Sequence, residues 1–317
     1  MTGRRRHYLL IAQILISAAL LGSLIHFAQP EKLWAALENI SPTAMVLATA
    51  AMIACNVTAA FRQSVILRSL GIGVSLRRMI VLNWMGLFAS NFLPSSVGGD
   101  AAIATFLQRR HQRLGTIVTG LLINRISGLV ALLIMLLVLL LVVDIGPLQA
   151  LVNRLILWSI GLLALGIAGI GLLFLLHRTG NRLSRLIVAI LAKLQLVGTA
   201  AQSLPQHFCL IFISSVVTMA LTVTAFGILG LSQYPPASFW STITIVLMLQ
   251  LVQLVPISFN GIGMAESLIT YCLAQTGWPL QDAALFGLVV RALMIVVSLP
   301  GALAFLFLPA DMVKQPK

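Results

Sequence analysis

The apolar course of this sequence breaks at NFLPSSVGGD, residues Asn91 to Asp100. Pro94 has no backbone N–H to donate and does not fit a helix interior, whereas Gly98 and Gly99 allow the chain to turn sharply. Asp100 then places a charge at the start of another apolar run. The segment therefore predicts a tight break between two short helices.

The composition places this break in a membrane. Of 317 residues, 60% are hydrophobic and 9% are charged, the mean hydropathy is +1.05, and several apolar runs approach the ~20 residues of a transmembrane helix. The net charge of +13 comes from short basic segments between these runs. Such segments are typical of cytoplasmic loops and not of a nucleic-acid-binding domain. We expect an all-α, polytopic membrane protein with both termini in the cytoplasm.

A second break follows far downstream, at VPISFNGIGMAE, residues Val255 to Glu266, and repeats the order of proline, serine, glycines and acid. Non-helical backbone at membrane depth is tolerated only where it is buried in protein or lines a wet cavity. Both breaks are therefore candidate parts of a functional site. Their turn-forming residues, the candidate gate, are Pro94, Gly98, Gly99, Asp100, Pro256, Gly261, Gly263 and Glu266.

Apolar runs and basic clusters together give the expected topology. Arg62, Arg68, Arg77 and Arg78 are interpreted as a cytoplasmic flank that ends the second span. Each break is expected to form a re-entrant hairpin, the first open to the cytoplasm and the second to the outside. An amphipathic helix is expected at the interface over 183–194. The expected spans are 8–28, 43–61, 114–143, 155–176, 208–231 and 283–308, and the expected hairpins are 79–107 and 239–274.

The chain divides into two halves of one membrane domain, 1–146 and 147–317, with the same order of elements. Each half has two spans, a hairpin and a closing span with one arginine. Arg125 follows Asp100 by 25 residues, and Arg291 follows Glu266 by 25 residues. Three full crossings per half is an odd number, so the second half is expected to be inverted. Inverted repeats with broken helices are used by many secondary transporters for alternating access.

The two arginines lie inside their spans, where an arginine must face protein or water. Because the guanidinium fork matches phosphate oxygens, Arg125 and Arg291 are candidates for binding an anionic headgroup. Alternatively, they pair with Asp100 and Glu266 and hold the hairpins in place. The acids themselves either cap the helices that they begin or couple transport to a proton or cation.

Further polar residues of the breaks and their neighbouring helices are candidate headgroup contacts, although such residues often only bridge helices. They are Asn91, Ser95, Asn124, Ser258 and Asn260. The motifs HExxH, GxSxG and the P-loop do not occur, and the histidines are scattered. The three cysteines lack CxxC spacing and are expected to pack in the membrane. We therefore expect no enzymatic activity, no metal and no cofactor.

Both breaks and the spans after them resemble the flippase-like membrane domain of bifunctional lysylphosphatidylglycerol synthase/flippases, which also occurs in stand-alone membrane proteins. The resemblance covers essentially the whole chain. It implies translocation of a lipid between leaflets, for example an aminoacylated phospholipid, a glycolipid or a polyprenyl-linked lipid. We expect no lipid synthesis, because the aminoacyl-transferring domain is absent from this sequence. The matching residues are Leu93, Pro94, Ser95, Gly98, Gly99, Asp100, Asn124, Arg125, Gly128, Pro256, Ile257, Ser258, Gly261, Gly263, Glu266 and Arg291.

Three positions depart from the pattern of the family that the chain resembles. Ile103 and Ala265 stand where the family often has an arginine, and Asn124 stands where an acid is common. The resemblance with these changes implies a less charged lipid headgroup. We expect a flippase-like transporter of a polar lipid in the bacterial inner membrane. The alternative is a non-catalytic subunit or scaffold for a separate lipid- or envelope-modifying enzyme. The expected partners are a membrane lipid and either a second copy of the chain or a lipid-synthesising enzyme, and no nucleic acid.

Overall fold

The computed structural model describes residues 41–92, 98–111, 114–143, 146–158, 160–161, 205–232, 238–253 and 261–307. These residues form helices and short connections with no β-strand among them, which confirms the expected all-α fold. The expected span 8–28, most of the expected span 155–176 and the expected interfacial helix lie outside the described residues. The same is true of five candidate site residues: Pro94, Ser95, Pro256, Ser258 and Asn260.

Four of the described helices are long and apolar enough to cross a membrane. Three of them agree with the expected spans to within a few residues, because their apolar runs end at clear polar or turn-forming residues. The first begins at Pro42, whose fixed φ suits the start of a helix. The four helices are α3 (Pro42–Ser69), α6 (Leu114–Val142), α9 (Phe208–Leu231) and α12 (Leu280–Phe307).

The expected end of the second span at residue 61 is wrong, because α3 continues to Ser69. Arg62, expected in the cytoplasmic flank, is instead a buried residue of this helix with 9% of its surface exposed. The helix ends where Gly71 adopts a positive φ of 78°. The N–H of Ile72 then donates to the carbonyl of Leu67 at 2.9 Å, which satisfies one of the last carbonyls of the helix.

Two pairs of shorter helices lie on either side of the Pro/Gly breaks, as expected from the sequence. The first pair is α4 (Leu76–Phe92) and α5 (Gly98–His111), and the second is α10 (Phe239–Gln253) and α11 (Met264–Gln275). At 1.5 Å per residue, the 14 residues of α5 span ~21 Å, less than the ~30 Å of a bilayer core. The helices of each pair pack against each other. We call these pairs the first and second hairpin.

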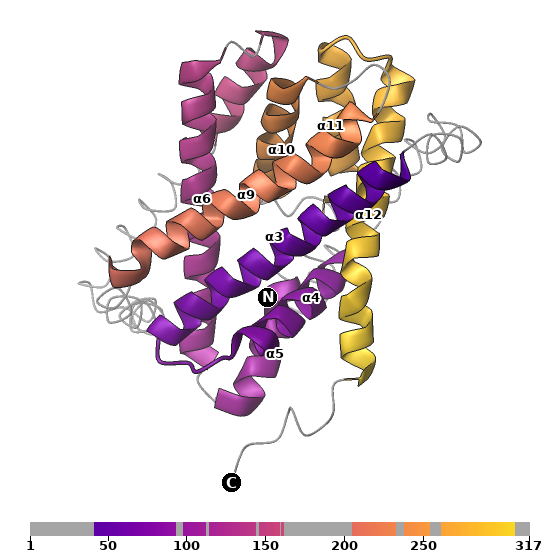
Figure 1. The fold of residues 1–317 in the computed structure, drawn as a ribbon. Helices are drawn as coiled ribbons and strands as arrows, with labels where there is room; N and C mark the ends of the chain where they lie inside the picture. Colours follow the sequence, from indigo (N-terminus) through magenta and orange to yellow (C-terminus); the bar gives the residue numbers. More distant parts are fainter. Residues whose placement is uncertain are drawn as a thin grey trace, which may run out of the picture.

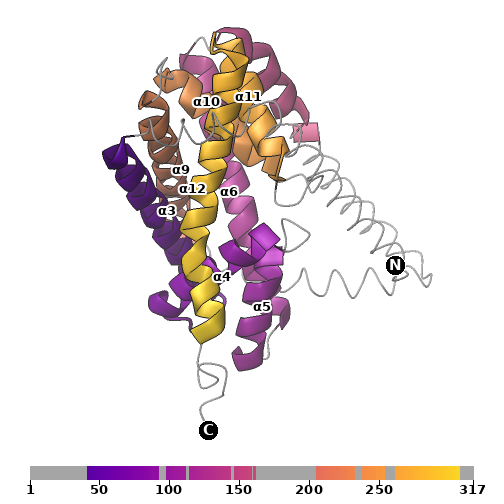
Figure 2. The ribbon, with the colours of Figure 1, turned by 90° about the vertical axis from the view of Figure 1, so that its right-hand side faces the viewer.

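The two hairpins lie at opposite ends of the molecule (Figures 1 and 2). Helices α3 and α9 lie side by side and make the most extensive helix contact of the described residues. Helix α12 extends along the length of the molecule and packs against both α11 and α4, while α6 packs against both α5 and α10. Each long closing helix thus contacts the hairpin of its own half and the hairpin of the other half.

Helix α12 is the most enclosed of the candidate spans, with 67% of its most apolar window buried. Its closest approach is to α4, where a Cβ on Gly301 would lie 2.1 Å from the carbonyl oxygen of Trp84. The indole N–H of Trp84 donates to the carbonyl of Val297 at 3.1 Å. Only glycine at position 301 therefore permits the two helices to cross at this distance. The main apolar core is formed by α9 to α12 with parts of α3 and α6.

Candidate substrate site

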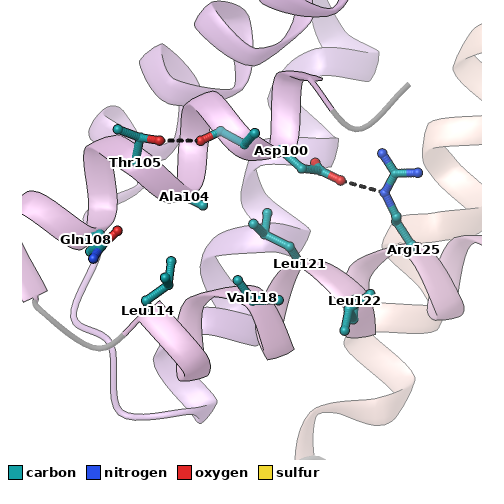
Figure 3. A pocket seen from close by; sticks show the side chains of 10 residues that line it. Asp100, Ala104, Thr105, Gln108, Leu114, Val118, Leu121, Leu122 and Arg125 are labelled. Carbon is teal, nitrogen blue, oxygen red and sulfur yellow. Dashed lines mark hydrogen bonds and ion pairs between the residues drawn. The ribbon is translucent and has the colours of Figure 1, made fainter. Parts of the chain in front are cut away.

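The first acid–arginine pair joins the first hairpin to α6. The Nε of Arg125 donates to Oδ2 of Asp100 at 2.5 Å, and the two side chains keep 32% and 24% of their surface exposed. Asp100 is in the first turn of α5, where the unsatisfied N–H groups of the helix favour a carboxylate. Arg125 reaches it from within α6, so the pair joins the start of α5 to the interior of α6 (Figure 3).

This pair forms one end of a pocket of ≈ 570 Å³ between α5 and α6. Figure 3 shows Asp100 and Arg125 turned toward each other at that end, with Gln108 and Leu114 toward the other. The wall supplied by α6 is aliphatic between these ends, and Leu114, Val118 and Leu122 are exposed. The pocket therefore combines a long apolar wall with a charged end. It is lined by Asp100, Ala101, Ala104, Thr105, Gln108, Leu114, Val118, Leu121, Leu122 and Arg125.

Helices α4 and α5 approach closely behind this pocket. A Cβ on Gly99 would lie 2.4 Å from the carbonyl oxygen of Gly86 and 2.3 Å from the hydroxyl oxygen of Ser90. Gly99 and the neighbouring Gly98 are both buried. The predicted role of Gly99 in the break is thus extended: it also allows the two helices of the hairpin to touch.

The second acid–arginine pair joins the second hairpin to α12 and is enclosed by protein. Arg291 Nε donates to Glu266 Oε1, and the two side chains keep only 7% and 1% of their surface exposed. The other carboxylate oxygen of Glu266 accepts the backbone N–H of Gly263 at 2.8 Å. Gly263 has a φ of 80°, which favours glycine, and Gly261 has a φ of 72°. Glu266 thus both caps α11 and pairs with Arg291.

The guanidinium of Arg291 is only partly satisfied. Its Nη1 and Nη2 are buried and make no hydrogen bond within the part of the chain that the structure describes. The space next to the side chain, between α10, α11 and α12, is too small for a water molecule. Gly287 lets α12 approach the backbone of Glu266, since a Cβ there would lie 3.1 Å from the Glu266 carbonyl oxygen. The second site is therefore closed, in contrast to the first.

Two predicted headgroup residues bridge helices and do not line the pocket. Asn91 Nδ2 donates to Ser298 Oγ at 2.9 Å, which connects α4 to α12. The side-chain oxygen of Asn124 accepts the Nε of Arg62 at 2.8 Å, which connects α6 to α3. The sequence places Arg125 and Asn124 side by side, but successive helical residues point in different directions, so only Arg125 reaches the pocket.

Arg62 is the polar residue that the sequence interpretation misplaced. Besides Asn124, it bonds Ser215 on α9, with 2.9 Å between Nη1 and Oγ. A signal for it exists in the sequence, because the apolar residues Val65, Ile66 and Leu67 continue the span after Arg62. Among the described residues, no group of three histidine, cysteine or acidic side chains is arranged to hold a metal ion.

The sequence matches a known protein family. No curated protein sequence matches the chain. The family model described as the lysylphosphatidylglycerol synthase TM region matches residues 10–301, nearly the whole sequence. With the helical membrane fold and the two Pro/Gly hairpins, this match shows that the chain belongs to the family of lysylphosphatidylglycerol synthase TM regions.

Proposed function

We propose that this chain is a flippase-like transporter that moves a polar lipid between the leaflets of a bacterial inner membrane. It acts without chemical conversion of the lipid and without a cofactor. Membership of a membrane-domain family related to lipid synthesis supports a lipid as the substrate. Both chain termini are assigned to the cytoplasm by the distribution of basic residues.

The pocket between α5 and α6 is the observation that carries this proposal. Its exposed aliphatic wall of Leu114, Val118 and Leu122 suits an acyl or polyprenyl chain. Its charged end at Asp100 and Arg125 suits a polar headgroup, because a guanidinium and a carboxylate together offer donors and acceptors. A lipid would thus enter sideways between two helices, with its headgroup moving along the protein and its tail remaining in the bilayer.

The placement of the two ion pairs supports alternating access. The hairpins lie at opposite ends, and the pair of the first is partly exposed while the pair of the second is buried. Several helix contacts made by the first half also have a counterpart in the second half. The contact of α4 with α12 corresponds to that of α10 with α6. Likewise, α5 with α6 corresponds to α11 with α12, and α3 with α4 corresponds to α9 with α10. Such matching is what two inverted repeats, 1–146 and 147–317, would give.

The charge of the pocket favours a headgroup with little net charge. The charges of Asp100 and Arg125 neutralise each other. Ile103 stands at a position where the family often has an arginine, and it is buried in the apolar core of the first hairpin. A zwitterionic phospholipid, a glycolipid or a polyprenyl-linked sugar fits this balance better than a strongly anionic lipid does.

Lipid exchange between leaflets tests the proposal. The purified protein is reconstituted into liposomes, and the leaflet exchange of a panel of labelled polar lipids is followed. We expect the wild type to accelerate exchange of at least one lipid class. Arg125→Gln and Arg291→Gln should lower this rate about tenfold or more, the effect of losing one charge-assisted contact. The exposed Arg68, which lies outside both ion pairs, provides the control Arg68→Gln.

No exchange for any member of a broad panel would contradict transport. The alternative of a scaffold or subunit makes a different prediction in cells. If deletion of the gene impairs the envelope but Arg125→Ala and Arg291→Ala are fully tolerated, the chain supports another protein and does not carry lipid through these sites.

A further inference from the structure

Arg62 is a buried cation at the junction of three helices. It lies on α3, 20 residues or ~30 Å from the start of that helix at Pro42, and keeps 9% of its surface exposed. Its Nε donates to Asn124 of α6 at 2.8 Å, and its Nη1 donates to Ser215 of α9 at 2.9 Å. An arginine inside a membrane span is unfavourable unless its charge is compensated by protein, water or an anion.

The partners of Arg62 are neutral. Arg125 and Arg291 each pair with a carboxylate, and these are the salt bridges of the described residues. Besides Asp100 and Glu266, the described residues contain one further acid, Asp282 in the first turn of α12. No carboxylate of the described helices therefore pairs with Arg62, and its hydrogen bonds to neutral groups do not compensate the positive charge of its guanidinium.

Four further acids, Glu31, Glu38, Asp144 and Asp311, lie outside the described residues, and none of them is close to Arg62, Asn124 or Ser215 in the sequence. Glu38 precedes the start of α3, whereas Arg62 lies near the other end of the same helix. Asp144 follows the end of α6, 20 residues after Asn124 in the sequence. Within the part of the chain that the structure describes, the α3, α6 and α9 junction therefore holds a positive charge without a carboxylate partner.

An apolar pocket of ≈ 210 Å³ lies beside this junction, between α6 and α9. Ser127, which lines it, donates its hydroxyl to the backbone carbonyl of Asn124 at 2.9 Å. Ile211, which also lines it, accepts the hydroxyl of Ser215 through its carbonyl at 2.9 Å. The pocket thus occupies the neighbouring turns of the two helices whose side chains bind Arg62, and two of its lining residues, Ile126 and Phe208, are exposed. Arg62, Asn124 and Ser215 lie next to the pocket and do not line it.

A cation next to an apolar pocket that opens to lipid matches the chemistry of an anionic amphiphile. We propose that Arg62, oriented by Asn124 and Ser215, binds the phosphate group of an anionic phospholipid whose acyl chain occupies the pocket between α6 and α9. The site is separate from the pocket at Asp100 and Arg125. The bound lipid supplies the negative charge that Asn124 lacks, and it rests against helices of both halves of the chain.

The decisive variant is Asn124→Asp, which is isosteric and gives Arg62 a carboxylate of its own. The full chain in a neutral detergent is titrated with dioleoyl phosphatidic acid and, separately, with dioleoyl phosphatidylcholine, and bound lipid is counted by native mass spectrometry. We expect the wild type to bind phosphatidic acid at least tenfold more tightly than phosphatidylcholine. Asn124→Asp and Arg62→Gln should each lower the ratio of the two lipid affinities about tenfold, as expected for loss of one charge-assisted interaction.

The control is Arg68→Gln, which removes an exposed arginine of the same helix. An equal loss of preference in this control would assign the effect to general surface charge and overturn the proposal. Thermal unfolding in detergent provides a second readout: Asn124→Asp should unfold at the wild-type temperature or above it, because it neutralises a buried cation.

Two further outcomes would overturn the proposal. One is an unchanged preference for phosphatidic acid in Asn124→Asp. The other is displacement of phosphatidic acid by millimolar inorganic phosphate, which would show that a free ion and not a lipid occupies the site. Because these measurements report equilibrium binding, they do not depend on whether the chain transports lipid.

Discussion

At the scale of single residues, the two acid–arginine pairs have the same chemistry in different surroundings. Asp100 and Arg125 are partly exposed, so solvent screens their attraction and either partner can be hydrated. Glu266 and Arg291 are almost completely buried, so removing one charge leaves the other without compensation. The second pair should therefore contribute to stability, while the first is available to exchange partners.

This difference predicts unequal effects of matched substitutions. Glu266→Gln should lower the free energy of unfolding by about 3–5 kcal/mol, because it leaves the cation of Arg291 buried and unpaired. Asp100→Asn should lower it by at most about 1 kcal/mol, as for a partly exposed pair. Unfolding of the detergent-solubilised protein by heat or denaturant measures both; equal losses would contradict the assignment of the second pair as the closed one.

At the scale of helices, glycine determines how closely the broken elements approach one another. Gly99 permits the contact between α4 and α5, and Gly301 permits the contact between α4 and α12. Helix α4 is thus held on two sides by backbone contacts that admit no side chain. Because both contacts involve its backbone, α4 is expected to move as one body rather than by local bending.

A single methyl group tests this packing. Gly99→Ala should destabilise the first hairpin by about 1–3 kcal/mol, because the new Cβ would overlap the Gly86 carbonyl and must push the helices apart. The control is Gly128→Ala on α6, where a Cβ would meet no atom within 4 Å. It should be neutral or stabilising by up to about 1 kcal/mol through helix propensity. Comparable melting temperatures for the two variants would argue against the tight α4–α5 contact.

At the scale of the whole molecule, the two halves are interleaved. Helix α3 packs along α9, α4 along α12 and α6 along α10, so each half contributes to the enclosure of the other. Polar bonds accompany these contacts, including Asn91 to Ser298 and Arg62 to Ser215. Opening of the second site by a shift of α12 would change the α4–α12 interface, which contains the tight contact of Gly301 with Trp84.

A reversible crosslink across α4 and α12 tests this motion. The double variant Asn91→Cys and Ser298→Cys is made in a chain whose native cysteines, Cys55, Cys209 and Cys272, are replaced by alanine. Because Asn91 Nδ2 and Ser298 Oγ are 2.9 Å apart, we expect oxidation to join the two positions. Lipid exchange should then fall to the background rate and recover on reduction. Full exchange in the oxidised protein would show that these helices stay together throughout transport.

Much of this architecture follows from the sequence. The bounds of α6, α9, α10 and α11 are given by apolar runs that end at polar or turn-forming residues. The 25-residue spacing pairs Asp100 with Arg125 and Glu266 with Arg291. The interpretation of the arginines as ion-pair partners is thus confirmed geometrically, while headgroup binding stays a prediction. For Glu266, helix capping is confirmed as well.

The sequence does not predict what depends on distant helices. Arg62 was assigned to a loop because a charge normally ends an apolar run, yet Asn124 and Ser215, which bond to it, are 62 and 153 residues away. Likewise, equal spacing in the two halves gives no indication that one ion pair is exposed and the other buried. The burial of each ion pair depends on how α12 and α6 pack against other helices, and the sequence pattern does not predict this packing.

The enclosure of α12 has a consequence for biosynthesis. Of the described helices it is the last to leave the ribosome, yet α3, α4 and α11 all pack against it. Until it is inserted, the groove that receives Gly301 on α4 is empty and Glu266 has no counter-ion in the membrane. Before α12 is inserted, the membrane-embedded part of the nascent chain therefore lacks the helix that completes its core. A nonsense codon at residue 280 should leave a product that membrane quality-control proteases recognise, even though every earlier span has been inserted.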